Sequence, residues 1–92
     1  MSPILHLNDL HCFVRVYELR SFSRAAETLD TVQSQVSARI QRLERFAGMP
    51  LFARLPHGIM PNGKGDVFYQ HAKRIISHIA DLESAVRERA AA

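Results

Sequence analysis

The sequence lacks several features that would place it in another class of protein. It has a single cysteine, Cys12, so no disulfide can form within the chain, and a reducing cytoplasm is the compartment we expect. No apolar run approaches the roughly 20 residues of a membrane span, and the N-terminus lacks the apolar core of a signal peptide. Internal repeats are also missing. We therefore expect neither a disulfide-rich secreted protein nor a membrane protein.

The side chains needed for catalysis or metal binding are few and scattered. The five histidines include no His-x3-His pair, and Cys12 has no partner at a ligand spacing, so we interpret it as a packing residue. Gly58, Gly63 and Gly65 are placed for turns and a helix start, not for a phosphate-binding loop. Five acidic residues are expected on separate helix surfaces: Asp9, Glu18, Glu27, Asp30 and Glu44. We expect no enzyme, no metal site and no cofactor in this chain.

What the sequence does contain fits one small domain with a local excess of positive charge. Its 92 residues are 47% hydrophobic, enough to build a single core, and its formal net charge is +3. Between residues 31 and 64 the only acidic residue is Glu44, against four arginines and one lysine. A basic excess concentrated in one region is typical of a nucleic-acid-binding surface.

Residues 31–45 form the most informative stretch, TVQSQVSARIQRLER. An apolar stripe at helical spacing continues just past it, through Val36, Ile40, Leu43 and Ala47, and predicts a helix with one buried face. The opposite face carries small polar residues, amides and arginines, which suit a helix inserted into the DNA major groove. That face consists of Ser34, Ala38, Gln41 and Arg45, with Ser37 and Arg42 beside it. Taken alone, the segment could also be a surface helix that happens to lack acids.

Two shorter helices are predicted before this stretch. Asn8 is expected to cap a helix over about 8–19, and a serine at 21–23 to cap a second helix that ends near Leu29. Asp30 then begins a tight turn, and Thr31 is the expected side-chain cap of the third helix. Two short helices joined by such a turn, with a polar and basic second helix, indicate a helix-turn-helix over about 22–41.

A β-hairpin and a long helix are predicted after it. Gly48 is expected to end the third helix, and a buried pair, Leu51 and Phe52, to anchor a hairpin over 54–61 that turns at 56–58. This hairpin would be a wing, whose exposed Arg54 and His57 could touch the DNA backbone or minor groove.

The last helix is predicted over about 63–89, capped by Asn62. Its apolar residues follow a heptad spacing, which favours pairing with the same helix of a second copy. We expect the far end of this seam to be exposed, because the rest of the chain is too short to cover it; a helix packed along its own domain is the alternative. The seam consists of Phe68, Ala72, Ile75, Ile79, Leu82 and Val86.

Several motifs in order resemble the N-terminal domain of LysR-type transcriptional regulators, over about residues 5–89. They are L-x-x-L-x-x-F from Leu7, S-F-S-R-A-A at 21–26, Q-S-Q-V-S-A-R-I-Q-R-L-E at 33–44, G-M-P-L-F-A-R at 48–54, and Gly65. The resemblance implies a mainly α fold, with a winged helix-turn-helix at 5–62 and a linker helix at 63–89 that pairs antiparallel in a homodimer. It also implies that a C-terminal domain, which would bind a small-molecule effector, is absent from this chain.

The resemblance also implies individual roles. The family's base-reading positions correspond to Gln33, Ser34, Ser37 and Ala38, its wing arginine to Arg54, and a frequent phosphate contact to Ser23. Three positions depart from the family pattern: Val32 replaces a common serine cap, Ser34 a common proline, and Ala38 a common arginine. The complete set of expected DNA-binding residues is Ser23, Thr31, Gln33, Ser34, Gln35, Ser37, Ala38, Gln41, Arg42, Arg45, Arg54 and His57.

The sequence thus predicts a dimeric protein that reads double-stranded DNA in the bacterial cytoplasm, with higher oligomers possible for the full-length protein. The alternative is a winged-helix module that binds an acidic protein partner through the basic face and has no DNA sequence preference.

Overall fold

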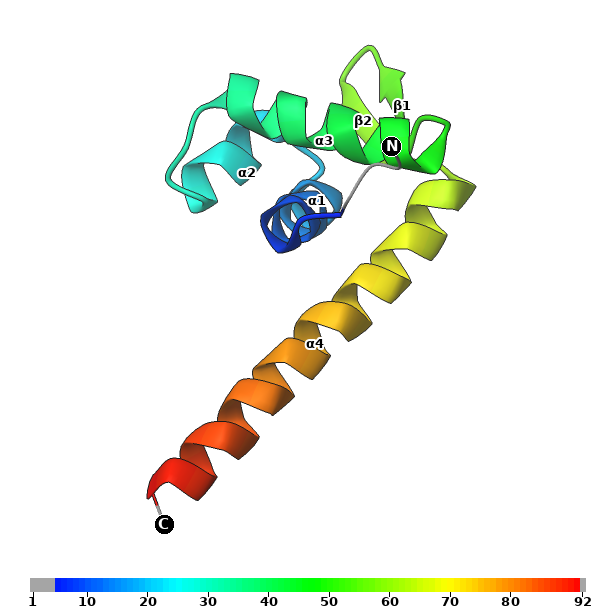
Figure 1. Ribbon diagram of the computed structural model, residues 1–92. Coiled ribbons are helices and arrows are strands. Elements are labelled where there is room, and N and C mark those ends of the chain that lie inside the picture. Colours follow the sequence, from blue (N-terminus) through cyan, green and yellow to red (C-terminus); the bar gives the residue numbers. More distant parts are fainter. Residues whose placement is uncertain (1–4, 92) are drawn as a thin grey trace.

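The computed structural model describes residues 5–91 of the chain, and the side chains among them through residue 88. Four helices and one hairpin follow in the order α1 (Leu7–Leu19), α2 (Phe22–Thr28), α3 (Gln33–Ala47), β1 (Phe52–Leu55), β2 (Gly58–Pro61) and α4 (Gly63–Ala91). Residues 5–62 form a head at one end of α4, which runs away from it as a single rod (Figure 1). The predicted mainly α winged helix-turn-helix with a long trailing helix is confirmed.

The start of α1 differs from the prediction. The helix begins at Leu7, and its N-cap is His6, which has an extended backbone and makes no capping hydrogen bond with its side chain. Asn8 lies inside the first turn, so the expected Asn8 cap is wrong. The His6 carbonyl instead accepts hydrogen bonds from the amides of Asp9 (3.0 Å) and Leu10 (3.2 Å). A capping side chain must belong to the N-cap residue, which has an extended backbone, and Asn8 lies two residues after it. The sequence also predicts a loose leader over residues 1–6, of which residues 1–4 lie outside the described residues.

The helix-turn-helix confirms one predicted cap and corrects another. Ser21 Oγ accepts a hydrogen bond from the amide of Arg24 (3.1 Å), as the capping chemistry of α2 requires. Thr31 does not cap α3: the N-cap is Val32, which has an extended backbone and no polar side chain. The Thr31 amide donates to the carbonyl of Ala26 (3.0 Å) and closes the end of α2. This bond keeps Thr31 one residue outside the cap position, too early in the chain to serve α3.

The core lies where α1, α2 and α3 meet, and the beginnings of β1 and α4 close it. The predicted inward stripe of α3 is confirmed, with Val36, Ile40 and Leu43 all at most 2% exposed. Cys12 is fully buried between apolar neighbours, as expected of a packing residue. The Phe13 ring is central: its centroid lies 5.2 Å from that of Phe52 and 4.8 Å from that of Phe68.

The hairpin and its approach follow the predicted local chemistry. Gly48 ends α3 in the left-handed conformation (φ 77°), which glycine adopts without strain. Leu51 and Phe52 are buried, and β1 pairs antiparallel with β2 from Phe52↔Pro61 to Leu55↔Gly58. The predicted wing is therefore present, with one buried end on the head and an exposed turn.

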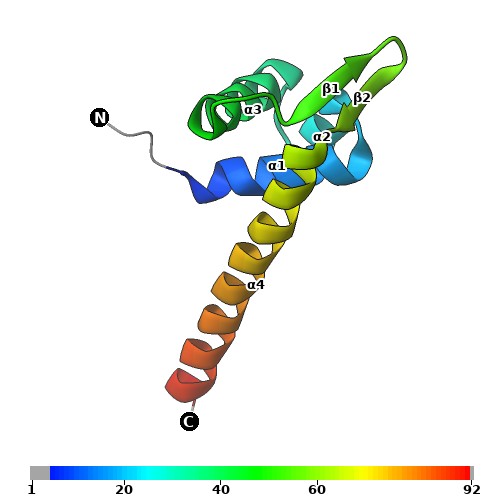
Figure 2. The ribbon, with the colours of Figure 1, turned by 90° about the vertical axis from the view of Figure 1, so that its right-hand side faces the viewer.

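The long helix α4 is packed against the head at its start and exposed over its far end. Asn62 Oδ1 accepts a hydrogen bond from the amide of Gly65 (2.8 Å), which confirms the predicted cap. Phe68 and Ala72, the first two seam positions, pack against the head. Beyond them the rod projects away from the head in both views (Figures 1 and 2). As expected, the far seam is open: Ile75 is 42% exposed, while Leu82 and Val86 are each more than half exposed.

Candidate nucleic-acid interface

The outer face of α3 is polar. The helix lies at the end of the molecule opposite the C-terminal end of α4 (Figure 2). Because the apolar stripe turns inward, Ser34, Ala38, Gln41 and Arg45 are all exposed on the other side of the helix. Gln35 is exposed beside them, and Ser37 and Thr31 are half-buried at the edges of this face. The structure therefore brings most of the predicted base-reading residues onto one accessible surface.

A cleft of about 360 Å³ continues this surface between α2, α3 and the wing. It brings together two residues of the predicted helix-turn-helix, Ser23 and Gln33, with two of the predicted wing, Arg54 and His57. The Arg54 guanidinium carbon lies 5.2 Å from the centroid of the Phe22 ring, so a cation–π contact holds the wing arginine against α2. The cleft thus presents hydroxyl, amide and cationic groups in one concavity, a combination suited to phosphates.

Arg20 also lines this cleft, and sequence reasoning missed it. It follows α1 in the left-handed conformation (φ 56°), its Nε donates to the carbonyl of Tyr17 (2.7 Å), and its guanidinium carbon lies 5.1 Å from the Tyr17 ring centroid. No other partner of its guanidinium occurs among the residues with described side chains. The available signal was its position, one residue before Ser21, where a helix break and a cap coincide.

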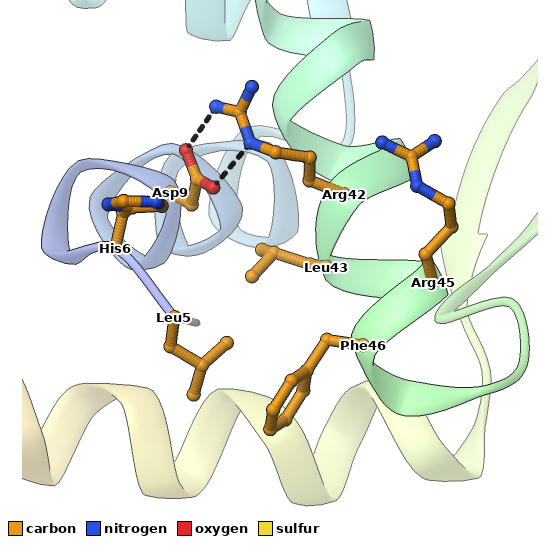
Figure 3. A pocket seen from close by; sticks show the side chains of 7 residues that line it. All are labelled: Leu5, His6, Asp9, Arg42, Leu43, Arg45 and Phe46. Atoms are coloured by element: carbon orange, nitrogen blue, oxygen red, sulfur yellow. Dashed lines mark hydrogen bonds and ion pairs between the residues drawn. The ribbon is translucent and has the colours of Figure 1, made fainter. Parts of the chain in front are cut away.

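Arg42 is placed differently from the other predicted contacts. Its Nε and Nη2 donate to the two carboxylate oxygens of Asp9 at 2.9 and 2.8 Å, while Arg45 points elsewhere (Figure 3). The Asp9 side chain is only 3% exposed, which corrects the prediction that it lies on a helix surface. The bond to Asp9 raises the pKa of Arg42 above its ordinary value. A phosphate contact by Arg42 stays a prediction, with two of its donors already engaged.

Other kinds of site find little support in the described part of the chain. No group of three or more histidine, cysteine or acidic side chains is close enough there to hold a metal ion. Burial raises the pKa of Cys12 to about 11, so its thiol is a poor nucleophile at neutral pH. Among the described helices, none combines the length and apolar character that crossing a membrane requires.

The fold and this surface define a class of protein: a winged helix-turn-helix domain with a helical extension. Residues 7–66 match the family model described as bacterial regulatory helix-turn-helix protein, lysR family. The chain therefore belongs to this family, and the resemblance inferred from its motifs is confirmed.

Curated relatives and solved structures agree with this membership. The chain is 38% identical over 86 residues to the HTH-type transcriptional regulator BudR of Klebsiella aerogenes, covering 94% of this chain and 57% of BudR. It is 34% identical to the HTH-type transcriptional regulator SoxR of Arthrobacter sp., covering 91% of this chain and 29% of SoxR. The chain thus spans from about a quarter to just over half of the relatives it matches.

Two similar structures are isolated domains in complex with DNA. The DNA-binding domain of BenM with catB site 1 DNA aligns with a TM-score of 0.91 and 32% identity, covering 96% of this chain and 99% of that one. The DNA-binding domain of CbnR with DNA aligns with a TM-score of 0.83 and 30% identity, covering 95% and 98%.

Proposed function

We propose that this chain is the DNA-reading part of a LysR-type transcriptional regulator and binds double-stranded DNA as a homodimer. The observation that carries the proposal is the continuous surface formed by the outer face of α3 and the wing cleft, which carries three cations, Arg20, Arg45 and Arg54, and no acid at its centre. A helix of this width fits the major groove of B-form DNA.

Base reading is the role of residues on the outer face of α3, from its first turn to Gln41. The amides of Gln33 and Gln41 can each form two hydrogen bonds with the major-groove edge of adenine, and the hydroxyls of Ser34 and Ser37 can donate or accept. Ala38 is small enough to let the helix approach closely and can contact a thymine methyl group. Gln35 and Thr31 lie at the margins of this surface.

Phosphate binding is the role of the residues around the base-reading surface. Arg45 lies farther along α3, while Arg54, His57 and Ser23 border the cleft. To these predicted contacts we add Arg20, because it lines the same cleft and its Nη groups are available. Contacts of this kind fix orientation and produce a dependence of affinity on salt. The DNA complexes formed by the similar BenM and CbnR domains support DNA binding by this fold.

Dimerisation is the role of the exposed seam on α4. Ile75, Leu82 and Val86 form an apolar row on a helix that its own head does not cover, and Ile79 lies between them. An apolar row of this kind is stabilised by a second copy. Two heads held by paired helices would place two α3 helices in successive major grooves, ~34 Å apart.

In a whole regulator this domain would act together with an effector-binding domain, to control transcription and not to catalyse a reaction. Its DNA target implies work in the bacterial cytoplasm.

The test is selection of bound sites from a random duplex pool, followed by titration of the selected and a random duplex at several salt concentrations. We expect a palindromic site and a preference of about 10³-fold or more over random duplex. The alternative, a module for an acidic protein partner, predicts no duplex binding even at low salt. That result would overturn the proposed function.

A further inference from the structure

We call the contact between α1 and α4 the joint. It contains two tyrosines, one on each helix, and each donates a hydrogen bond to an acidic residue on the opposite helix. The Tyr17 and Tyr69 rings stack with centroids 3.8 Å apart and planes 8° apart. The Tyr17 hydroxyl, on α1, donates to Asp66 on α4 (2.8 Å), and the Tyr69 hydroxyl, on α4, donates to Glu18 on α1 (2.6 Å). We name these four residues the tyrosine clamp.

The clamp differs in kind from the rest of the joint. The other contacts there are apolar, from Phe68, Ala72 and Ile76 of α4 against the core, with one looser ion pair of 3.6 Å between Lys73 and Glu18. Apolar burial has little directional preference, so one helix can rotate over the other with small loss. Hydrogen bonds weaken steeply once their angles are distorted. Two reciprocal bonds around a ring stack therefore define one angle between the helices.

We infer that the tyrosine clamp is a positioning device that fixes the angle between the head and α4, and thereby the separation of the two DNA half-sites that a dimer can read. The inference rests on the proposed function as a dimeric DNA reader. It assigns a role in site selection to residues that lie outside the DNA-facing surface.

The length of α4 makes this angle matter. Its 29 residues form a rod of about 43 Å at 1.5 Å per residue. The clamp lies at Tyr69, so about 33 Å of the rod extends beyond it. A change of about 10° at the joint would displace the far end of α4, and with it the head of a partner copy paired there, by about 6 Å, nearly two base pairs. A loose joint would thus let the dimer accept half-sites at several separations, and a fixed joint selects one.

The clamp is also connected to the DNA-facing cleft. Arg20 bonds the Tyr17 carbonyl and places its guanidinium near the Tyr17 ring while lining the cleft. A phosphate bound by Arg20 would therefore contact a residue that itself contacts the clamp at Tyr17.

The test removes the two hydroxyls and keeps the stacked rings, in the variant Tyr17→Phe/Tyr69→Phe of the full chain. Thr28→Val is the matched control, because it removes a hydroxyl bonded to the Ala25 carbonyl (2.9 Å) within the head and away from α4. Each protein is titrated against a single half-site and against palindromes whose half-sites are moved apart or together by one to three base pairs.

We expect the native chain and Thr28→Val to prefer one separation by about tenfold over separations that differ by two base pairs. The double variant should bind the single half-site within about twofold of the native chain, yet discriminate between separations by less than about threefold. A double variant that melts at a lower temperature but keeps the full preference would show that the tyrosines only stabilise the fold, and would overturn the inference.

A second measurement is independent of DNA. Spin labels at Glu27→Cys on the head and Glu83→Cys on α4, in chains diluted with unlabelled protein, report the distribution of distances across the joint. The inference predicts a narrow distribution of label-to-label distances in the native chain and a broader one in the double variant. An unchanged width would overturn the inference. Should the native chain bind no duplex, the proposed function fails, and this width still decides whether the clamp fixes the joint.

Discussion

Asp9 and Arg42 are 33 positions apart in the sequence and form a two-bond ion pair, with N–O distances of 2.8 and 2.9 Å. The pair joins the first turn of α1 to the middle of α3. The carboxylate is almost completely buried, whereas the arginine side chain is 48% exposed. Removing Arg42 would therefore leave a buried carboxylate without a partner, whereas removing Asp9 would leave a guanidinium that water can reach.

We predict that Arg42→Ala destabilises the fold more than Asp9→Asn. Without Arg42 a buried carboxylate loses its partner, which should lower the free energy of unfolding by about 2–3 kcal/mol after allowance for the exposed arginine. Asp9→Asn leaves a half-exposed guanidinium that water can solvate, so about 1 kcal/mol is expected. Urea unfolding measures both, with Arg45→Ala as an exposed control expected within about 0.5 kcal/mol of the native chain. A larger loss for Asp9→Asn would contradict this assignment.

Base reading predicts a selective loss of affinity. Ser34→Ala or Gln33→Ala should weaken binding to the selected site by about 1–3 kcal/mol, because a base-edge contact is lost, and should leave random duplex nearly unaffected. Titration of both duplexes at one salt concentration measures the difference. Equal losses on the two duplexes would remove these residues from the base-reading surface.

Arg45 and Arg42 should differ in their effect on salt dependence. Arg45→Ala is expected to weaken both duplexes and to reduce the slope of log affinity against log salt by about 0.9, the value for one phosphate contact. Arg42→Gln should change the slope less, because Asp9 already engages two of its donors. The slope is measured over a series of salt concentrations. An equal reduction for both would establish Arg42 as a phosphate contact despite its ion pair.

Two glycines near the start of α4 provide a matched pair for stability. A Cβ at Gly65 would clash with the Leu51 carbonyl oxygen, a backbone atom that cannot move aside easily, and would crowd the Pro61 side chain. Gly65→Ala should therefore lower the free energy of unfolding by about 1–3 kcal/mol. At Gly63 a Cβ would meet nothing within 4 Å, so Gly63→Ala should be neutral or stabilising by up to about 1 kcal/mol. Thermal unfolding of both variants measures the two stabilities, and a larger loss for Gly63→Ala would contradict the close approach of Gly65 to the Leu51 backbone.

The clamp predicts a loss of stability at alkaline pH. Its bond to Glu18 raises the pKa of Tyr69 to about 12, and the bond to Asp66 raises the pKa of Tyr17 above 10.0. Because the folded pKa of Tyr69 exceeds the unfolded value of about 10, the stabilisation is complete below pH 10 and is lost as pH rises toward 12. The chain has two tyrosines and no tryptophan, so phenolate absorbance reports these groups alone. If both tyrosines of the native chain titrated with the ordinary tyrosine pKa of about 10, the two hydrogen bonds would be contradicted.

The candidate site could be predicted from the sequence only where local patterns determine it. The inward stripe of α3 fixes which residues face outward, so the accessible surface with Ser34 and Arg45 followed from periodicity alone. The sequence could not show that Arg20 enters the wing cleft or that Arg42 bonds Asp9. Both depend on how α1 packs against other elements.

Local chemistry in the chain determined the elements and most of their ends: the helix period, the caps at Ser21 and Asn62, and the left-handed Gly48. It failed for Asn8 and Thr31, because a cap needs one particular backbone position and a shift of one or two residues removes it. Tertiary structure alone decided the pairing of Asp9 with Arg42 and the two bonds of the tyrosine clamp, whose partners are 49 and 51 residues apart. The physical reason is that periodicity and capping act over a few residues, whereas these contacts form only after α1 has been packed against α3 and α4.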